Sequence, residues 1–91
     1  MTDQTKRTIV VTGGSRGIGR IICCELATPG TTVYFNYFNP GDPEGEAAAA
    51  AETEKMVAEL GAVAKSKAVD VSSTEDVAAF FNDILKDTGL K

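Results

Sequence analysis

The residues most able to do chemistry lie in the glycine-rich segment 12–19, TGGSRGIG. It follows the apolar, β-branched run 9–11 and precedes a helical pattern. Where a strand turns into a helix, free backbone N–H groups and the positive end of the helix dipole attract phosphate. The segment therefore predicts a pyrophosphate-binding turn. The alternative is a turn that needs small residues only for packing.

The three glycines of this turn and the polar residues between them each have an expected role. Gly13 permits a tight exit from the strand, Gly17 lets the backbone approach a phosphate, and Gly19 allows close packing of helix on sheet. Ser15 and Arg16 project from the loop, where both side chains can contact phosphate.

The elements that must position this turn alternate along the chain. Strands are expected at 8–12, 32–37 and 66–71, and helices at 17–28, from 44 or 46 to 60, and from 72 to 88. Residues 38–45 form a loop rich in proline and glycine, read as a mobile insertion or as a flap over the ribose.

Two helices carry further sequence signals. Ile18, Ile22 and Leu26 recur every four residues and predict the buried stripe of the first helix. Ser72 and Glu75 form a capping box that starts the last helix.

This alternation predicts an α/β fold with a parallel sheet in the order 3-2-1 and right-handed crossovers. The first two helices share one face and the third covers the other, which gives a three-layer, Rossmann-like arrangement. Residues 1–91 form one domain that resembles a truncated doubly wound sheet, in which a fourth strand would lie beside the first after Lys91.

Composition narrows the class of protein. The 13 acidic and 9 basic residues give a net charge of −4, which argues against a nucleic-acid partner. No apolar run approaches the ~20 residues of a membrane span. The adjacent Cys23 and Cys24 indicate reduced thiols in a cytoplasmic protein, and with no histidine a zinc site is not expected.

The glycine spacing is G-x-x-x-G-x-G rather than G-x-G-x-x-G. With VTGGSRGIG, the strand end VYFNY and the later DVSS, the chain resembles the short-chain dehydrogenase/reductase family over residues 8–89. Within it, the chain is most similar to the 3-oxoacyl-[acyl-carrier-protein] reductase branch of fatty acid biosynthesis.

The resemblance implies a nicotinamide cofactor site. Its pyrophosphate would be lined by Gly13, Ser15, Arg16, Gly17, Ile18 and Gly19. Asn36 and Tyr37 occupy the positions that contact the adenosine ribose in this family. Asn36 carries no charge to repel a 2′-phosphate and Arg16 can pair with one, so NADP(H) is expected over NAD(H). The alternative for Asn36 and Tyr37 is an ordinary strand end.

The same resemblance places adenine at the end of the third strand. The Asp70 carboxylate would accept from the adenine amino group, and the Val71 N–H would donate to the ring. The alternative for Asp70 is a turn residue that precedes the helix at Ser72.

Catalysis in this family needs a serine and a Tyr-x-x-x-Lys pair. Tyr34 is followed four residues later by Phe38, and Tyr37 by Gly41. We therefore expect the cofactor-binding half of a carbonyl reductase, with no ketone reduction by this chain alone. A non-catalytic nucleotide-binding or oligomerising module is the alternative function. Asn36 disfavours an S-adenosylmethionine-dependent transferase, and no G-K-[ST] follows the glycines, which excludes P-loop chemistry.

The first strand would have a bare, apolar edge in such a half-domain. We expect that edge to pair with a second copy or with the missing C-terminal half. Phe80, Phe81 and Ile84 are expected to stay half covered.

Overall fold

The computed structural model describes residues 6–89. Within them a three-stranded parallel sheet has the order β1-β2-β3, as the sequence predicted. The strands are β1 (Arg7–Val11), β2 (Thr31–Tyr37) and β3 (Val63–Ala68), and the helices are α1 (Gly17–Glu25), α2 (Pro43–Glu59) and α3 (Thr74–Thr88).

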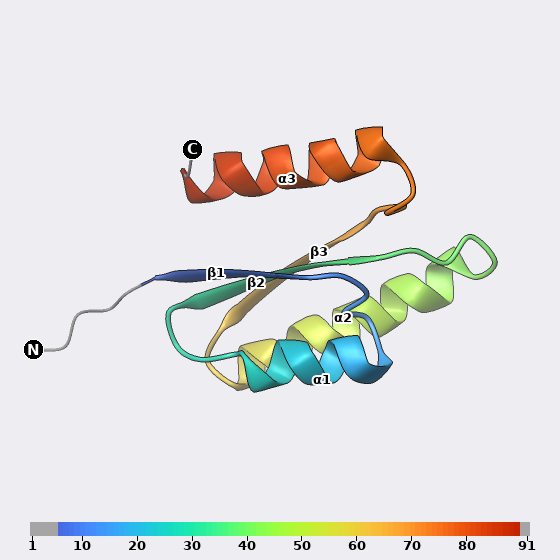
Figure 1. The fold of residues 1–91 in the computed structure, drawn as a ribbon. Coiled ribbons are helices and arrows are strands. Elements are labelled where there is room, and N and C mark those ends of the chain that lie inside the picture. The colour runs from blue at the N-terminus through green and yellow to red at the C-terminus, as the bar shows by residue number, and fades with distance from the viewer. Residues whose placement is uncertain (1–5, 90–91) are drawn as a thin grey trace, which may run out of the picture.

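The sheet lies between two helical layers (Figure 1). Helices α1 and α2 cover one face and α3 the other, which confirms the predicted three layers. Side chains of a strand alternate between faces, so β2 sends Val33 and Phe35 toward α1 and α2, and Tyr34 toward α3. The larger core is formed by Val11, Cys23, Ala27, Val33, Phe35, Ala50, Val57 and Ala62. A smaller one under α3 is formed by Tyr34, Val69, Phe80 and Ile84.

The predicted apolar stripe of α1 is wrong. Ile18 is 77% exposed, and Ile22 and Leu26 are also on the surface, whereas Cys23 and Ala27 are buried. The inward positions of α1 are held by small side chains, which join the core beside Val33 and Phe35. Periodicity alone favoured the larger residues of the wrong face.

Three boundaries also differ from expectation. Strand β3 begins at Val63 and ends at Ala68, so it overlaps the predicted range 66–71 but lies three residues earlier at each end. Ser73 caps α3 in place of Ser72, since its Oγ accepts a hydrogen bond from the Asp76 amide at 3.2 Å. Helix α2 begins at Pro43, which shortens the preceding loop.

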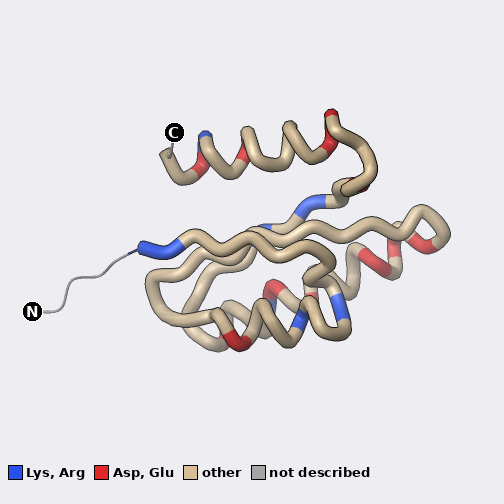
Figure 2. Tube along the Cα trace, viewed as in Figure 1, with Lys and Arg blue, Asp and Glu red and all other residues tan. Residues whose placement is uncertain are grey.

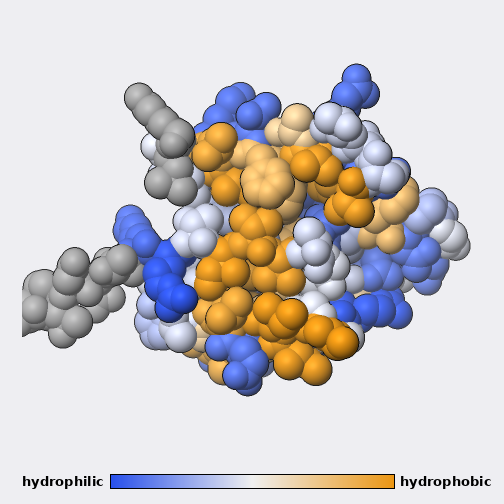
Figure 3. All heavy atoms as spheres, viewed as in Figure 1, coloured by the Kyte–Doolittle hydropathy of each residue, from blue (hydrophilic) through white to orange (hydrophobic). Residues whose placement is uncertain are grey.

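An apolar face runs over α1 and the outer edge of β1 (Figure 3). Its exposed members on α1 and at its C-cap, which we call the α1 face, are Ile18, Ile21, Ile22 and Leu26. Phe80, Phe81 and Ile84 of α3 were expected to stay half covered. This was wrong in part, because Phe80 and Ile84 are buried and only Phe81 is half exposed.

Among the helices of residues 6–89, none has the length and apolar character needed to cross a bilayer.

Candidate nucleotide-binding site

The glycine turn connects β1 to α1 and leaves backbone donors at the helix start. Arg16 is the N-cap of α1 and its side chain makes no capping hydrogen bond. Within the described chain, the amides of residues 15–19 have no hydrogen-bond acceptor. Free N–H groups at a helix N-terminus are the donors that hold a phosphate.

Two glycines have the geometry expected of them. Gly17 has a φ of +62°, and a Cβ built there would meet nothing within 4 Å, so the backbone is open to a ligand. A Cβ on Gly19 would lie 1.9 Å from the Gly13 carbonyl oxygen. Close packing of α1 on the turn therefore requires glycine at position 19.

The first two amides of the turn are used inside the protein. The Gly13 amide donates to Asn36 Oδ1 at 2.9 Å, and the Gly14 amide donates to the Asn36 carbonyl at 3.2 Å. The donors available to a phosphate therefore begin at Ser15.

Asn36 joins the carboxyl ends of the strands. Its Nδ2 donates to the Val69 carbonyl at 2.9 Å, while its Oδ1 accepts from Gly13, and the residue is 4% exposed. The side chain points into the molecule, as expected if Asn36 simply ends the strand. Neighbouring Tyr37 is only half buried.

The ends of the strands surround a hollow of about 350 Å³. Its lining residues are Thr12, Gly13, Asn36, Tyr37, Phe38, Val69, Asp70 and Val71. The structure thus brings the predicted ribose and adenine residues to one place beside the glycine turn. Val71 is 61% exposed at its rim.

Asp70 also orders the turn that leads to α3. Its Oδ1 accepts from the Ser72 hydroxyl at 2.7 Å and from the Ser72 amide at 2.9 Å, and these bonds lower the pKa of the Asp70 carboxyl. Asp70 therefore has the alternative role, that of a turn residue before α3. A carboxylate has further acceptor positions, so this role leaves room for a ligand.

A carboxylate that sequence reasoning missed reaches the turn from α2. Glu46 accepts a hydrogen bond from Ser15 Oγ, pairs with Arg16 Nη2 at 3.2 Å and accepts from Asn39 Nδ2 at 3.3 Å. The Ser15 bond is the main cause that lowers the pKa of Glu46. Because Glu46 opens an alanine run, only its position in the first turn of a helix could have drawn attention to it.

Helix α2 holds the turn at a second point. Arg20 Nη2 donates to the Ser15 carbonyl at 2.7 Å and to the Ala49 carbonyl at 2.9 Å, and Arg20 Nε donates to Thr53 Oγ1 at 2.9 Å. The acidic start of α2 and the basic start of α1 lie at the same end of the molecule (Figure 2). The loop conformation at Ser15 is thus fixed by α2.

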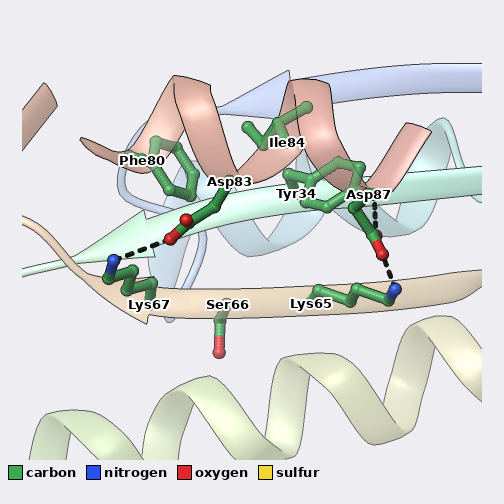
Figure 4. A pocket seen from close by; sticks show the side chains of 8 residues that line it. All are labelled: Tyr34, Lys65, Ser66, Lys67, Phe80, Asp83, Ile84 and Asp87. Atoms are coloured by element: carbon green, nitrogen blue, oxygen red, sulfur yellow. Dashed lines mark hydrogen bonds and ion pairs between the residues drawn. The ribbon is translucent and has the colours of Figure 1, made fainter. Parts of the chain in front are cut away.

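A second hollow, of about 280 Å³, lies beneath α3 (Figure 4). Asp87 accepts from Tyr34 Oη and from Lys65 Nζ, and Asp83 pairs with Lys67 at 2.9 Å. Burial and the Asp87 contact raise the pKa of Tyr34 to about 12, so this tyrosine stays protonated near neutral pH. The cluster therefore ties α3 to β2 and β3.

Two known reductases are similar to this chain in sequence. A 1-cyclohexenylcarbonyl-CoA reductase of Streptomyces collinus is 34% identical over 97% of this chain, and tetrahydroxynaphthalene reductase PfmaG of Pestalotiopsis fici is 38% identical over 88%. The chain spans 29% and 27% of the lengths of these relatives.

Solved structures give the same result. A metagenomic short-chain oxidoreductase in complex with NADP matches 96% of this chain and 37% of its own, with 28% identity and a TM-score of 0.78. A dehydrogenase of Burkholderia cenocepacia with bound NADP matches 94% and 31%, with 25% identity and a TM-score of 0.80. The short chain dehydrogenase family model matches residues 7–90, and the chain belongs to that family.

Proposed function

We propose that this chain is the nucleotide-binding part of an NADP(H)-dependent oxidoreductase that reduces a carbonyl by hydride transfer. The observation that carries the proposal is the set of unused amides at residues 15–19, aligned at the start of α1. The structural neighbours with bound NADP support the choice of cofactor.

Each part of the site has a proposed role. The amides of residues 15–19 hold the pyrophosphate, and the Arg16 guanidinium, whose side chain is 60% exposed, pairs with the 2′-phosphate. Tyr37 lies beside the ribose, and Asp70 and Val71 contact adenine at the rim of the hollow. Gly13 and Asn36 shape the turn from within.

When bound, the cofactor supplies the hydride at its nicotinamide ring. This chain's residues bind and orient the adenosine end and the phosphates. Neither tyrosine has a lysine four positions later, so we assign no proton transfer to these 91 residues. We expect no carbonyl reduction by them alone.

For the substrate, we propose a 3-oxoacyl thioester. The motifs TGGSRGIG, VYFNY and DVSS support that branch. One relative is named for a coenzyme A thioester, which supports the thioester part alone, because its cyclohexenyl group carries no 3-oxo function. Other relatives are named for hydroxynaphthalene, steroid and glucose substrates, so assays of a full-length reductase that carries this segment must include each class.

Calorimetric titration with ADP-ribose and 2′-phospho-ADP-ribose tests the binding site without a nicotinamide ring. In the Gly17→Ala variant a methyl group occupies the open side of the turn, and we expect affinity to fall at least about tenfold. Gly89→Ala is the matched control, since Gly89 shares a left-handed φ, of +75°, and an open Cβ position, but ends α3 and lies outside the glycine turn. No binding of either ligand by the unmodified chain would overturn the proposal.

A non-catalytic, oligomerising module is the second candidate, and the exposed α1 face favours it. The partner would be a second copy or a C-terminal half supplied as another chain. Recovery of carbonyl reduction on mixing with such a half supports the oxidoreductase. Stable association and nucleotide binding with no recovered turnover support the module.

A further inference from the structure

The end of β2, where the ribose of a cofactor would bind, presents no charged side chain to the ligand. Asn36 is uncharged, 4% exposed and bonded at both ends of its amide, to Gly13 and to Val69. A neutral side chain that is buried in this way presents no charge with which to distinguish a ribose hydroxyl from a phosphate. Discrimination must come from groups on the neighbouring segments.

Glu46 is a charged group that meets this requirement. Its carboxylate touches both segments that flank the ribose position, the glycine turn through Ser15 and Arg16, and the loop after β2 through Asn39. The Glu46 side chain is 9% exposed, so its position is well fixed, whereas that of Arg16 is 60% exposed. The arginine is open to a ligand while one of its nitrogens is already paired.

We propose that Glu46 sets the cofactor preference by competing with the 2′-phosphate for Arg16. This inference rests on the proposed nucleotide site. A phosphate on Arg16 would lie close to the Glu46 carboxylate, and two like charges that share one guanidinium repel each other. The ion pair therefore lowers affinity for the 2′-phosphorylated nucleotide and leaves the 2′-hydroxyl form unaffected.

The test is the ratio of dissociation constants for ADP-ribose and 2′-phospho-ADP-ribose, measured by calorimetry on the 91-residue chain. Glu46→Gln keeps an acceptor for Ser15 Oγ and removes the charge. We expect it to tighten 2′-phospho-ADP-ribose about tenfold and to leave ADP-ribose within twofold. Glu44→Gln removes one charge from the same first turn of α2 and should leave the ratio unchanged.

Arg16 provides a second test that does not depend on changing the buried carboxylate. Arg16→Ala should weaken 2′-phospho-ADP-ribose more than ADP-ribose. In the double variant with Glu46→Gln, the tenfold gain should disappear, because the carboxylate acts through Arg16. Glu46→Asp retains the charge and should keep the ratio near that of the unmodified chain.

The outcomes separate this inference from the proposed function. If the unmodified chain binds neither ligand, the nucleotide site itself is wrong. If both ligands bind and Glu46→Gln leaves their ratio unchanged, the site stands and the role of Glu46 is overturned. An equal gain for both ligands also overturns it, because the carboxylate would then act on the pyrophosphate.

Discussion

Asn36 Oδ1 accepts a hydrogen bond from the Gly13 amide at 2.9 Å, across 23 residues of sequence. The same side chain donates to the Val69 carbonyl. One buried amide thus fixes the end of β2 to the glycine turn on one side and to the chain leaving β3 on the other. The hollow beside the turn owes its shape to these two bonds.

Replacing Asn36 with aspartate should destabilise the chain. An aspartate carboxylate can accept from Gly13 but faces the Val69 carbonyl with an acceptor in place of a donor, in a site that is 4% exposed. We expect the free energy of unfolding in urea to fall by about 2 kcal/mol. The same change at the exposed Asn82 serves as the control, and equal losses at both positions would contradict this role.

Gly19→Ala should destabilise the chain by about 3 kcal/mol, because the added methyl would strike a backbone oxygen that cannot move freely. That oxygen belongs to Gly13, 1.9 Å from the ideal Cβ. Gly41→Ala, with its nearest atom at 3.5 Å, should change stability by less than about 0.5 kcal/mol. Thermal unfolding followed by circular dichroism measures both, and a folded Gly19→Ala variant with unchanged midpoint would refute the packing argument.

Sequence reasoning predicted the parts of the fold that depend on local pattern. The alternation of β-branched runs with helical stretches was enough for strand order, layers and the position of the turn. The stripe of α1 was mispredicted because the buried positions of this helix hold the small residues Cys23 and Ala27, while its isoleucines are exposed. The spacing of apolar residues does not show which face of a helix packs against the sheet.

The site was predictable only where a motif carries it. Residues 15–19 follow from glycine spacing, and Asp70 and Val71 follow from the family resemblance. The contact of Glu46 with Ser15 spans 31 residues and depends on how α2 crosses the sheet. The inward turn of Asn36 likewise depends on tertiary hydrogen bonds, which residue type alone does not specify.

The two cysteines should differ in reactivity. Cys23 is fully buried, and burial, with a smaller effect from Cys24, raises the pKa of its thiol to about 11. Cys24 is only partly buried. A thiol reagent at pH 8 should therefore modify Cys24 at least about tenfold faster in the folded chain.

Counting modified thiols in the native chain and in guanidinium checks this difference. The Cys24→Ser variant should show no rapid reaction until it unfolds. Rapid modification of both thiols in the folded chain would show that α1 does not stay packed on the sheet.

The free energy of unfolding should fall in alkaline solution because Tyr34 ionises. Its pKa is raised to about 12, mainly by burial and then by the Asp87 contact, from an ordinary value of 10.0. As pH rises, Tyr34 loses its proton in the unfolded chain before it does so in the folded chain. The contribution of protonated Tyr34 to stability is therefore fully present below pH 10 and is lost as pH rises from about 10 through 12.

Urea unfolding at several pH values between 9 and 12 measures the effect. Tyr34→Phe should flatten the alkaline loss, whereas Tyr37→Phe should retain it. An identical alkaline slope in the Tyr34→Phe variant would assign the loss to other groups.

The α1 face should drive self-association of the isolated chain. Within residues 6–89, β1 pairs only with β2, so its other edge is free, and the apolar face that runs over α1 and this edge is exposed (Figure 3). An unpaired strand edge next to contiguous apolar surface favours contact with another chain. We therefore expect sedimentation velocity to show species larger than 9.5 kDa that increase with concentration.

A single polar substitution should reduce that association if the face is responsible. Ile21 is 61% exposed, so Ile21→Gln removes apolar surface without disturbing the core, and the fraction of monomer should rise. Leu60→Gln is the matched control, because Leu60 is 48% exposed at the end of α2, outside the α1 face. A concentration-independent, cooperatively folded monomer of the unmodified chain would rule out this interface, and equal effects of the two substitutions would assign association to general hydrophobicity.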